Sequence, residues 1–94
     1  MKLRWSPEAL QDLLDIHDFI SRKAPAQADQ LIDALITSAE QLERFPHSGR
    51  SVPEYDVPAI REIIHSPYRI IYRVENTSVE IVTVLHGARK LTSD

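Results

Sequence analysis

The chain has 94 residues, of which 43% are hydrophobic and 27% charged, and its formal net charge at pH 7 is -3. This composition excludes disordered and fibrous proteins and predicts one globular domain over residues 1–94. The absence of cysteine excludes disulfides, a thiolate nucleophile and cysteine-ligated zinc. No apolar run approaches the ~20 residues that span a bilayer, and no signal peptide is recognised, so we expect a cytoplasmic protein without a membrane partner.

The first half of the chain is predicted to form a strand and two helices. A short strand over residues 2–5 ends at Ser6-Pro7, where Ser6 is a suitable N-cap and Pro7 needs no amide donor at the first helical position. Apolar residues then recur at helical spacing to about residue 22, and the acidic side chains take the other, solvated faces. A second amphipathic helix begins near Pro25. Because only a few residues join the helices, they should form an antiparallel hairpin.

The second half is predicted to form strands. Residues 46–58 are interrupted by three prolines and a Ser-Gly pair, which is typical of a loop. Three β-rich segments follow at residues 59–65, 68–74 and 79–86, and their short connections require antiparallel neighbours. The predicted fold class is therefore α+β: an N-terminal strand, a two-helix antiparallel hairpin and a three-stranded antiparallel meander, with the helices on one face of a small sheet.

Side-chain alternation on the strands suggests a binding surface. If the helices cover the more apolar face, the opposite face presents Arg61, Arg69 and Arg73. Guanidinium groups bind phosphate or carboxylate at two points, so this face would be a site for an anionic partner. Alternatively, these arginines are only solvated, or they pair with nearby glutamates such as Glu62 and Glu80.

Charge is also divided unevenly along the chain. Residues 1–43 contain four basic and eight acidic side chains, whereas residues 44–94 contain seven basic and six acidic ones. This permits a local positive surface on the second half, but one far weaker than the basic stripe of a dedicated DNA-binding domain. We expect no direct sequence-specific DNA binding by this chain alone.

Other kinds of site are disfavoured by the sequence. The four histidines are far apart and lack ligand spacing, so we predict no metal. With only two glycines, the chain has no phosphate-binding loop, and no serine lies in a nucleophile elbow, so we predict no cofactor. Trp5 is either part of the core or an anchor for a partner, since tryptophan is common at interface hot spots.

Several segments, taken in order, resemble the ParE/RelE toxin superfamily over nearly the whole chain. They are Trp5-Ser6-Pro7-Glu8-Ala9, Leu42-Glu43-Arg44-Phe45-Pro46, Ile60-Arg61-Glu62, Tyr68-Arg69-Ile70-Ile71-Tyr72-Arg73-Val74 and Val84-Leu85-His86-Gly87-Ala88-Arg89. The resemblance implies the toxin of a type II toxin-antitoxin module, of the kind associated with plasmid stabilization and growth arrest. It also implies a cognate antitoxin, whose extended segment wraps the toxin.

The superfamily has two branches with different activities. RelE-like members are ribosome-dependent, metal-independent mRNA endonucleases, and ParE-like members bind and inhibit DNA gyrase without established catalytic residues. Arg69 matches an arginine of the endonuclease motif, and His86 and Arg89 lie near other functional groups of that branch. However, residues 47–56 contain no lysine and no tyrosine follows His86, so groups that would stabilise a developing phosphate charge are missing. The His-Gly-x-Arg ending also resembles ParE.

We therefore predict a ParE-like DNA gyrase inhibitor with no catalytic residues. Its expected target- or antitoxin-binding residues are Arg61, Arg69, Arg73, His86 and Arg89. One alternative is a RelE-like enzyme that cuts mRNA on the ribosome with Arg69, His86 and Arg89 as its catalytic groups. The other is an inactive relative that only binds an antitoxin.

Overall fold

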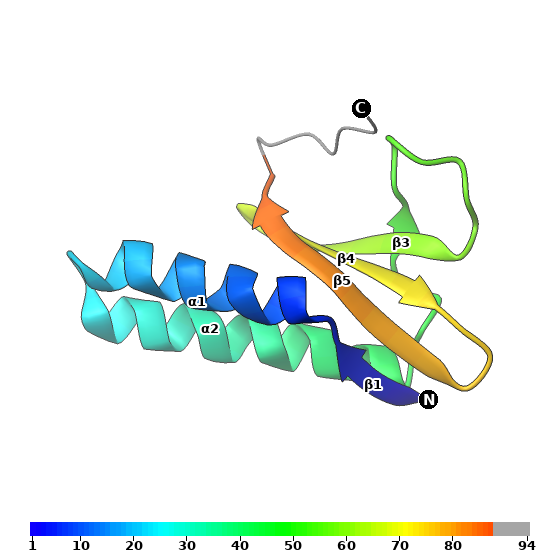
Figure 1. The fold of residues 1–94 in the computed structure, drawn as a ribbon, viewed down its shortest axis with the longest axis horizontal. Coiled ribbons are helices and arrows are strands. Elements are labelled where there is room, and N and C mark those ends of the chain that lie inside the picture. Colours follow the sequence, from blue (N-terminus) through cyan, green and yellow to red (C-terminus); the bar gives the residue numbers. More distant parts are fainter. Residues whose placement is uncertain (88–94) are drawn as a thin grey trace.

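The computed structural model describes residues 1–87 as a helical hairpin packed against a five-stranded sheet (Figure 1). The elements in chain order are β1 (Lys2–Trp5), α1 (Pro7–Ser21), α2 (Pro25–Glu40), the 3-10 helix η1 (Gln41–Glu43), β2 (Arg50–Ser51), β3 (Ile60–His65), β4 (Tyr68–Val74) and β5 (Ser78–His86). This arrangement confirms the predicted α+β class, with the hairpin preceding the meander. Neither described helix has the length and apolar character that a membrane-spanning segment needs.

The sheet order is β1-β5-β4-β3-β2, so the first strand of the chain lies beside the last. β1 runs parallel to β5, with Lys2 opposite Ser78 and Trp5 opposite Ile81, and the other pairs are antiparallel. The two-residue strand β2 pairs with β3 at the other edge of the sheet. β2 lies inside the predicted loop and was not predicted, because two residues are too few to show an alternating pattern.

The start of α1 is fixed to the sheet by one serine. The Ser6 Oγ accepts a hydrogen bond from the Ala9 amide at 2.9 Å, which satisfies one of the unpaired amides at the helix start. The same hydroxyl donates to the Val82 carbonyl oxygen at 2.8 Å. Ser6 therefore caps α1, as predicted, and also links the helix to β5.

The main core lies between the hairpin and the sheet. Its buried members come from α1, α2, η1, β4 and β5 and are Ala9, Leu13, Leu35, Ala39, Leu42, Tyr68, Ile70, Tyr72, Val79, Ile81 and Val84. Trp5 is half-buried and packs against this cluster, so this tryptophan belongs to the core. Burial of these side chains, at about 25 cal/mol per Å² of apolar surface, is the main force that holds the two layers together.

Asp12, which was expected on a solvated face of its helix, also contacts the sheet. Its Oδ2 accepts hydrogen bonds from the Thr83 hydroxyl at 2.7 Å and from the Val84 amide at 2.9 Å. Both donors belong to the part of β5 where the register with β4 shifts and Val82 is left without a partner. A carboxylate of α1 thus supplies a hydrogen-bond acceptor to a bulged strand.

Tyr72 connects the loop after η1 to the sheet by hydrogen bonds. Its buried hydroxyl donates to the Pro46 carbonyl oxygen at 2.8 Å and accepts from the Gly49 amide at 2.9 Å. Burial raises the pKa of the Tyr72 phenol above its ordinary value of 10.0, although the Gly49 amide and the Arg61 charge act in the opposite direction. The folded protein therefore holds this proton more tightly than the unfolded chain does.

A Tyr72→Phe variant tests this hydroxyl. Near neutral pH, the loss of its two hydrogen bonds is expected to lower the free energy of unfolding by about 1–2 kcal/mol. Because the folded-state pKa is raised, the tyrosine contribution is fully present below the unfolded-state pKa and is lost as the pH rises above it. Denaturant unfolding of both proteins should therefore show a difference in unfolding free energy that narrows as the pH rises above about 10. A difference that stays constant over this range would contradict the assignment.

Candidate functional site

The predicted open face of three arginines is not formed. Residues directly opposite each other on antiparallel strands share a face. Arg61 lies opposite Tyr72, whose side chain is in the main core, whereas Arg69 lies opposite Ile64 on the other face. Arg61 therefore points to the helix side of the sheet, and its Nη1 donates to the Gly49 carbonyl oxygen at 3.0 Å. The prediction that Arg61, Arg69 and Arg73 share one surface is wrong.

The face of the sheet away from the helices is also partly covered. Residues 52–57, which belong to the loop between β2 and β3 and are here called the 52–57 segment, pack against this face. Val52 of this segment is buried against Ile71 and Leu85 in a second, smaller core, with Tyr55 and Ile60 packed around it. A guanidinium group that points to this side consequently meets protein and not only solvent.

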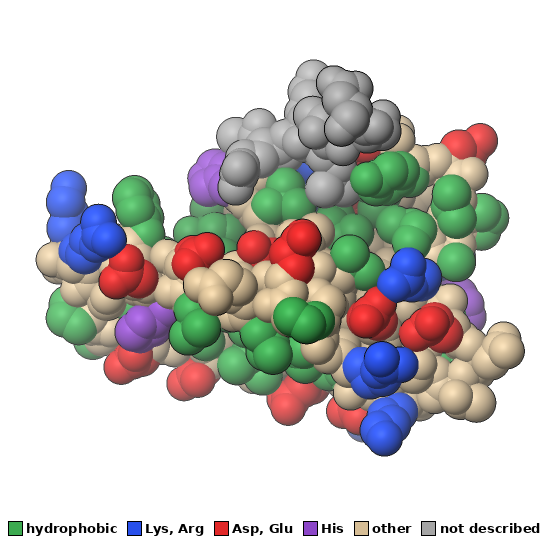
Figure 2. All heavy atoms as spheres, in the orientation of Figure 1, with side chains coloured by type: hydrophobic (Ala, Val, Ile, Leu, Met, Phe, Trp, Pro, Cys, Tyr) green, Lys and Arg blue, Asp and Glu red, His purple; other side chains and the backbone are tan. Residues whose placement is uncertain are grey.

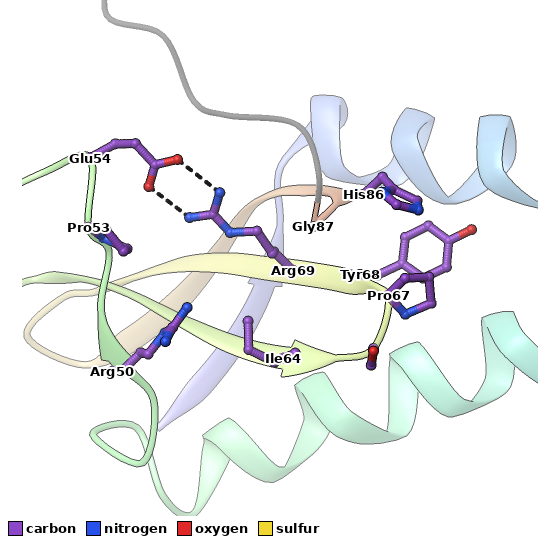
Figure 3. A pocket seen from close by; sticks show the side chains of 10 residues that line it. Arg50, Pro53, Glu54, Ile64, Pro67, Tyr68, Arg69, His86 and Gly87 are labelled. Atoms are coloured by element: carbon purple, nitrogen blue, oxygen red, sulfur yellow. Dashed lines mark hydrogen bonds and ion pairs between the residues drawn. The ribbon is translucent and has the colours of Figure 1, made fainter.

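Arg69 is buried beneath the 52–57 segment and bound by two carboxylates. Its Nε donates to Glu62 Oε1 at 2.7 Å, and its Nη1 and Nη2 each donate to one oxygen of Glu54 at 2.9 Å (Figure 3). The side chain is only 8% exposed. The hydrogen bonds to Glu54, opposed by desolvation and supported by Glu62, raise the pKa of Arg69 above its ordinary value. Arg69 is thus a permanently charged group in a two-point ion pair.

The ion pair continues through Glu62 to a second arginine. The Glu62 side chain is completely buried, and its Oε2 accepts from the Arg50 Nε at 2.6 Å. Arg50, Glu62, Arg69 and Glu54 thus form a row of alternating charges, here called the ion row, with no net charge. Such a row is typical of a structural network, and it corresponds to the alternative in which Arg69 pairs with a neighbouring glutamate.

A pocket of about 620 Å³ opens beside the outer end of the ion row. Its lining includes Arg50, Pro53, Glu54, Ile64, Arg69 and His86 (Figure 3). The Ile64 side chain is 52% exposed. His86 packs edge-on against the Tyr68 ring, with 5.8 Å between the ring centroids. Two of the predicted site residues, Arg69 and His86, therefore line one pocket.

The remaining predicted residues do not join this pocket. Arg73 forms an exposed ion pair with Glu80 on the neighbouring strand β5. Pairs of this type contribute about 0–1 kcal/mol to stability. Arg89 lies outside the described residues. Over residues 1–87, no group of three His, Cys, Asp or Glu side chains is arranged to hold a metal ion.

A second candidate surface lies on the outer side of the hairpin. A groove of about 760 Å³ runs between α1 and α2 and is lined by Leu10, Leu13, Leu14, His17, Asp29, Ile32 and Asp33. Leu14 is 65% exposed, and the His17 Nε2 lies 2.7 Å from Asp29 Oδ1 across the groove. Figure 2 shows hydrophobic and acidic side chains side by side over this hairpin. An apolar groove with acidic edges is suited to a partner segment with apolar and basic residues.

The fold is similar to those of solved toxin-antitoxin proteins. A chain of the chromosomal ParDE TA system from P. aeruginosa aligns with a TM-score of 0.77 and 22% identity, covering 92% of this chain and 95% of that one. A chain of the toxin-antitoxin complex RelBE2 from Mycobacterium tuberculosis aligns with a TM-score of 0.64 and 23% identity, covering 90% and 95% respectively. At these identities, the likeness establishes the shared fold.

Sequence comparison identifies the family. Toxin RelE2 of Caulobacter vibrioides is 35% identical over 86 residues, which are 90% of this chain and 93% of that protein. Toxin RelE3 of the same organism is 30% identical over 88 residues, covering 89% and 91%. The family model described as the ParE toxin of the type II toxin-antitoxin system parDE matches residues 3–91. Because this match spans nearly the whole chain, the chain belongs to the ParE family and is a type II toxin of the ParE/RelE superfamily.

Proposed function

We propose that the toxin acts by binding and inhibiting DNA gyrase in the cytoplasm and that a cognate antitoxin neutralises it. The binding of Arg69 by two carboxylates is the observation that supports this proposal most directly. An mRNA endonuclease that works without a metal needs positive groups aimed at the phosphate that becomes more charged during attack. In this chain the strand arginine is buried, and three of its nitrogens donate to Glu54 and Glu62. This neutral ion row is better suited to holding a protein surface in shape than to phosphate chemistry.

The alternative activity is mRNA cleavage on the ribosome. The names Toxin RelE2 and Toxin RelE3 of the two Caulobacter relatives favour it. Arg69 and His86 also line the same pocket, where they would act as the charge-stabilising and proton-transferring groups. This alternative requires the carboxylate of Glu54 to leave Arg69 when RNA binds, because the two Nη groups already donate to it.

A pair of assays separates the two activities. In a supercoiling assay with purified gyrase, excess toxin is expected to inhibit, and a translation reaction with a defined mRNA should leave that mRNA intact. Intact gyrase activity together with cleaved mRNA, abolished by Arg69→Ala, would overturn the gyrase proposal and establish the endonuclease. If the chain affects neither reaction and causes no growth arrest when expressed, yet binds its antitoxin, the inactive alternative is correct.

The antitoxin is proposed to use the outer groove of the hairpin as part of its binding surface. Leu10 and Leu14 offer apolar contacts, while Asp29 and Asp33 offer partners for basic side chains. Binding to the folded toxin would also stabilise it by mass action. Leu14→Glu should weaken antitoxin binding in a calorimetric titration without lowering the thermal stability of the free toxin. Unchanged affinity would place the antitoxin elsewhere.

A further inference from the structure

We propose that Arg69 anchors an exchangeable site for an acidic side chain of a protein partner and that Glu54 occupies this site in the free chain. The partner would place an aspartate or glutamate on the Nη1 and Nη2 groups of Arg69 and apolar neighbours over the rim of the pocket. Glu54 would move out as the partner carboxylate moves in. Displacement of Glu54 by RNA is what the endonuclease alternative requires, whereas this proposal concerns displacement by a protein carboxylate, and the test below separates the two kinds of ligand.

The ion row holds Arg69 ready for such an exchange. Its Nε donates to Glu62 at 2.7 Å, and Glu62 is completely buried and is itself held by Arg50. These contacts do not involve Glu54, so they fix the plane of the guanidinium whether or not Glu54 is bound. Nη1 and Nη2 point together to the Glu54 carboxylate (Figure 3). The two N–H groups that face Glu54 lie side by side, which is the arrangement that binds a carboxylate at two points.

Glu54 is the member of the ion row that can be exchanged without breaking the core. Its side chain is 20% exposed, against 0% for Glu62 and 8% for Arg69. It lies in the 52–57 segment, which has no regular secondary structure and is held to the sheet by the side chains of Val52 and Tyr55. Movement of the Glu54 side chain therefore does not require Val52 to leave the second core.

The pocket around this site favours an acidic peptide over a nucleic acid. Once Glu54 moves out, Arg50, Glu62 and Arg69 leave the ion row with a single positive charge, which one carboxylate balances. A nucleic acid brings a phosphate at every nucleotide and is usually bound by several basic groups. Ile64, Pro53 and Pro67 supply apolar lining at the pocket, and Ile64 is half exposed. An acidic residue flanked by apolar residues matches both features.

Competition by Glu54 predicts a measurable effect on affinity. A ligand that needs an open site binds more weakly in proportion to the fraction of molecules in which the site is open. If Glu54 occupies Arg69 in about nine of ten molecules, its removal strengthens binding about tenfold. Glu54→Gln keeps the size of the side chain and removes its charge, so it is the appropriate variant.

The experiment is an NMR titration of the full chain that follows the Arg69 Nε–Hε signal. The probes are acetyl-Leu-Glu-Leu-amide, the matching Leu-Gln-Leu peptide and inorganic pyrophosphate. We expect the glutamate peptide to shift the Arg69 signal of the wild type and to bind Glu54→Gln about tenfold more tightly. Glu80→Gln, which removes the partner of the exposed Arg73, serves as the matched control and should leave peptide affinity unchanged.

Three results would overturn the proposal. The first is equal affinity of the glutamate peptide for wild type, Glu54→Gln and Glu80→Gln, and the second is equal binding of the two peptides. The third is that Glu54→Gln binds pyrophosphate more tightly than the wild type does but does not bind the glutamate peptide more tightly, which would identify a phosphate site. If Glu54→Gln does not fold, the wild-type titration still decides, because an exchangeable site must shift the Arg69 signal with the glutamate peptide alone. None of these results changes the outcome expected in the gyrase supercoiling assay.

Discussion

Replacing Arg69 by methionine is expected to lower the free energy of unfolding by about 3–5 kcal/mol, the usual cost of removing one member of a buried ion pair. Methionine retains much of the arginine volume but offers no donors. Glu62 would remain completely buried with only the exposed Arg50 as an ionic partner, and Glu54 would lose both of its hydrogen bonds to Arg69. Equilibrium unfolding in urea at neutral pH measures the loss.

Two further variants serve as controls. One tests the general effect of losing a positive charge, and the other tests the effect of the two carboxylates, Glu54 and Glu62, that lose Arg69. Arg73→Met removes an exposed arginine from the same strand and should cost at most about 1 kcal/mol. Adding Glu54→Gln and Glu62→Gln to Arg69→Met should restore part of the lost stability, because no uncompensated carboxylate then remains buried. Equal effects of Arg69→Met and Arg73→Met would show that the ion row is not a stabilising unit.

The second large effect is expected at Gly49, where the sheet and the preceding loop touch. A Cβ atom at this position would lie 2.5 Å from the Glu62 carbonyl oxygen and 2.5 Å from the Tyr72 hydroxyl. Backbone cannot yield as a flexible side chain can, so alanine must displace the loop and break the hydrogen bond from the Gly49 amide to Tyr72. We expect Gly49→Ala to cost about 3 kcal/mol, at the upper end of overpacking effects.

Thermal and denaturant unfolding of Gly49→Ala and Ser48→Ala provide the comparison. Ser48 is the exposed neighbour, so its truncation should change stability by less than about 0.5 kcal/mol. A combined Gly49→Ala and Tyr72→Phe variant should lose less than the sum of the single changes, because both act on the same contact. Additive losses, or a Gly49→Ala protein as stable as the wild type, would contradict the close packing.

The two helices and the strands β3, β4 and β5 were predictable because each carries a local signal. Ser6 and Pro7 mark the start of α1, apolar spacing marks both helices, and β-rich runs between turn residues mark β3, β4 and β5. These signals depend only on neighbouring residues. The position of β1 beside β5 has no such signal, since it depends on contacts between residues about 76 positions apart, such as Lys2 and Ser78.

The arginine surface was predicted incorrectly because faces were assigned strand by strand. Alternation places Arg61 with Ile63 and His65, and Arg69 with Ile71, but it does not say which set faces the helices. The register decides this: Tyr68 follows His65 across a two-residue turn and lies opposite it, which sets Arg61 opposite Tyr72. Applying the short Ser66-Pro67 turn to both strands would have placed Arg61 on the Tyr72 face.

The ion row was harder to predict from sequence. The alternation and register that place Arg69 on one face also place Glu62 there, so this pair is predictable from the sequence. Glu54 belongs to an irregular segment, whose path over the sheet is set by the burial of Val52 and Tyr55 and not by a repeating pattern. Loop conformations of this kind depend on tertiary contacts that periodicity does not report.

The pairing of β1 with β5 also bears on how the toxin is made in the cell. During synthesis, the hairpin leaves the ribosome well before residues 78–81, which pair with β1. Until those residues emerge, β1 lacks its neighbour and the apolar side of the hairpin lacks most of the strands that cover it. A nascent chain that lacks β5 is thus incompletely folded, so newly made toxin acquires its folded shape only after β5 has emerged from the ribosome.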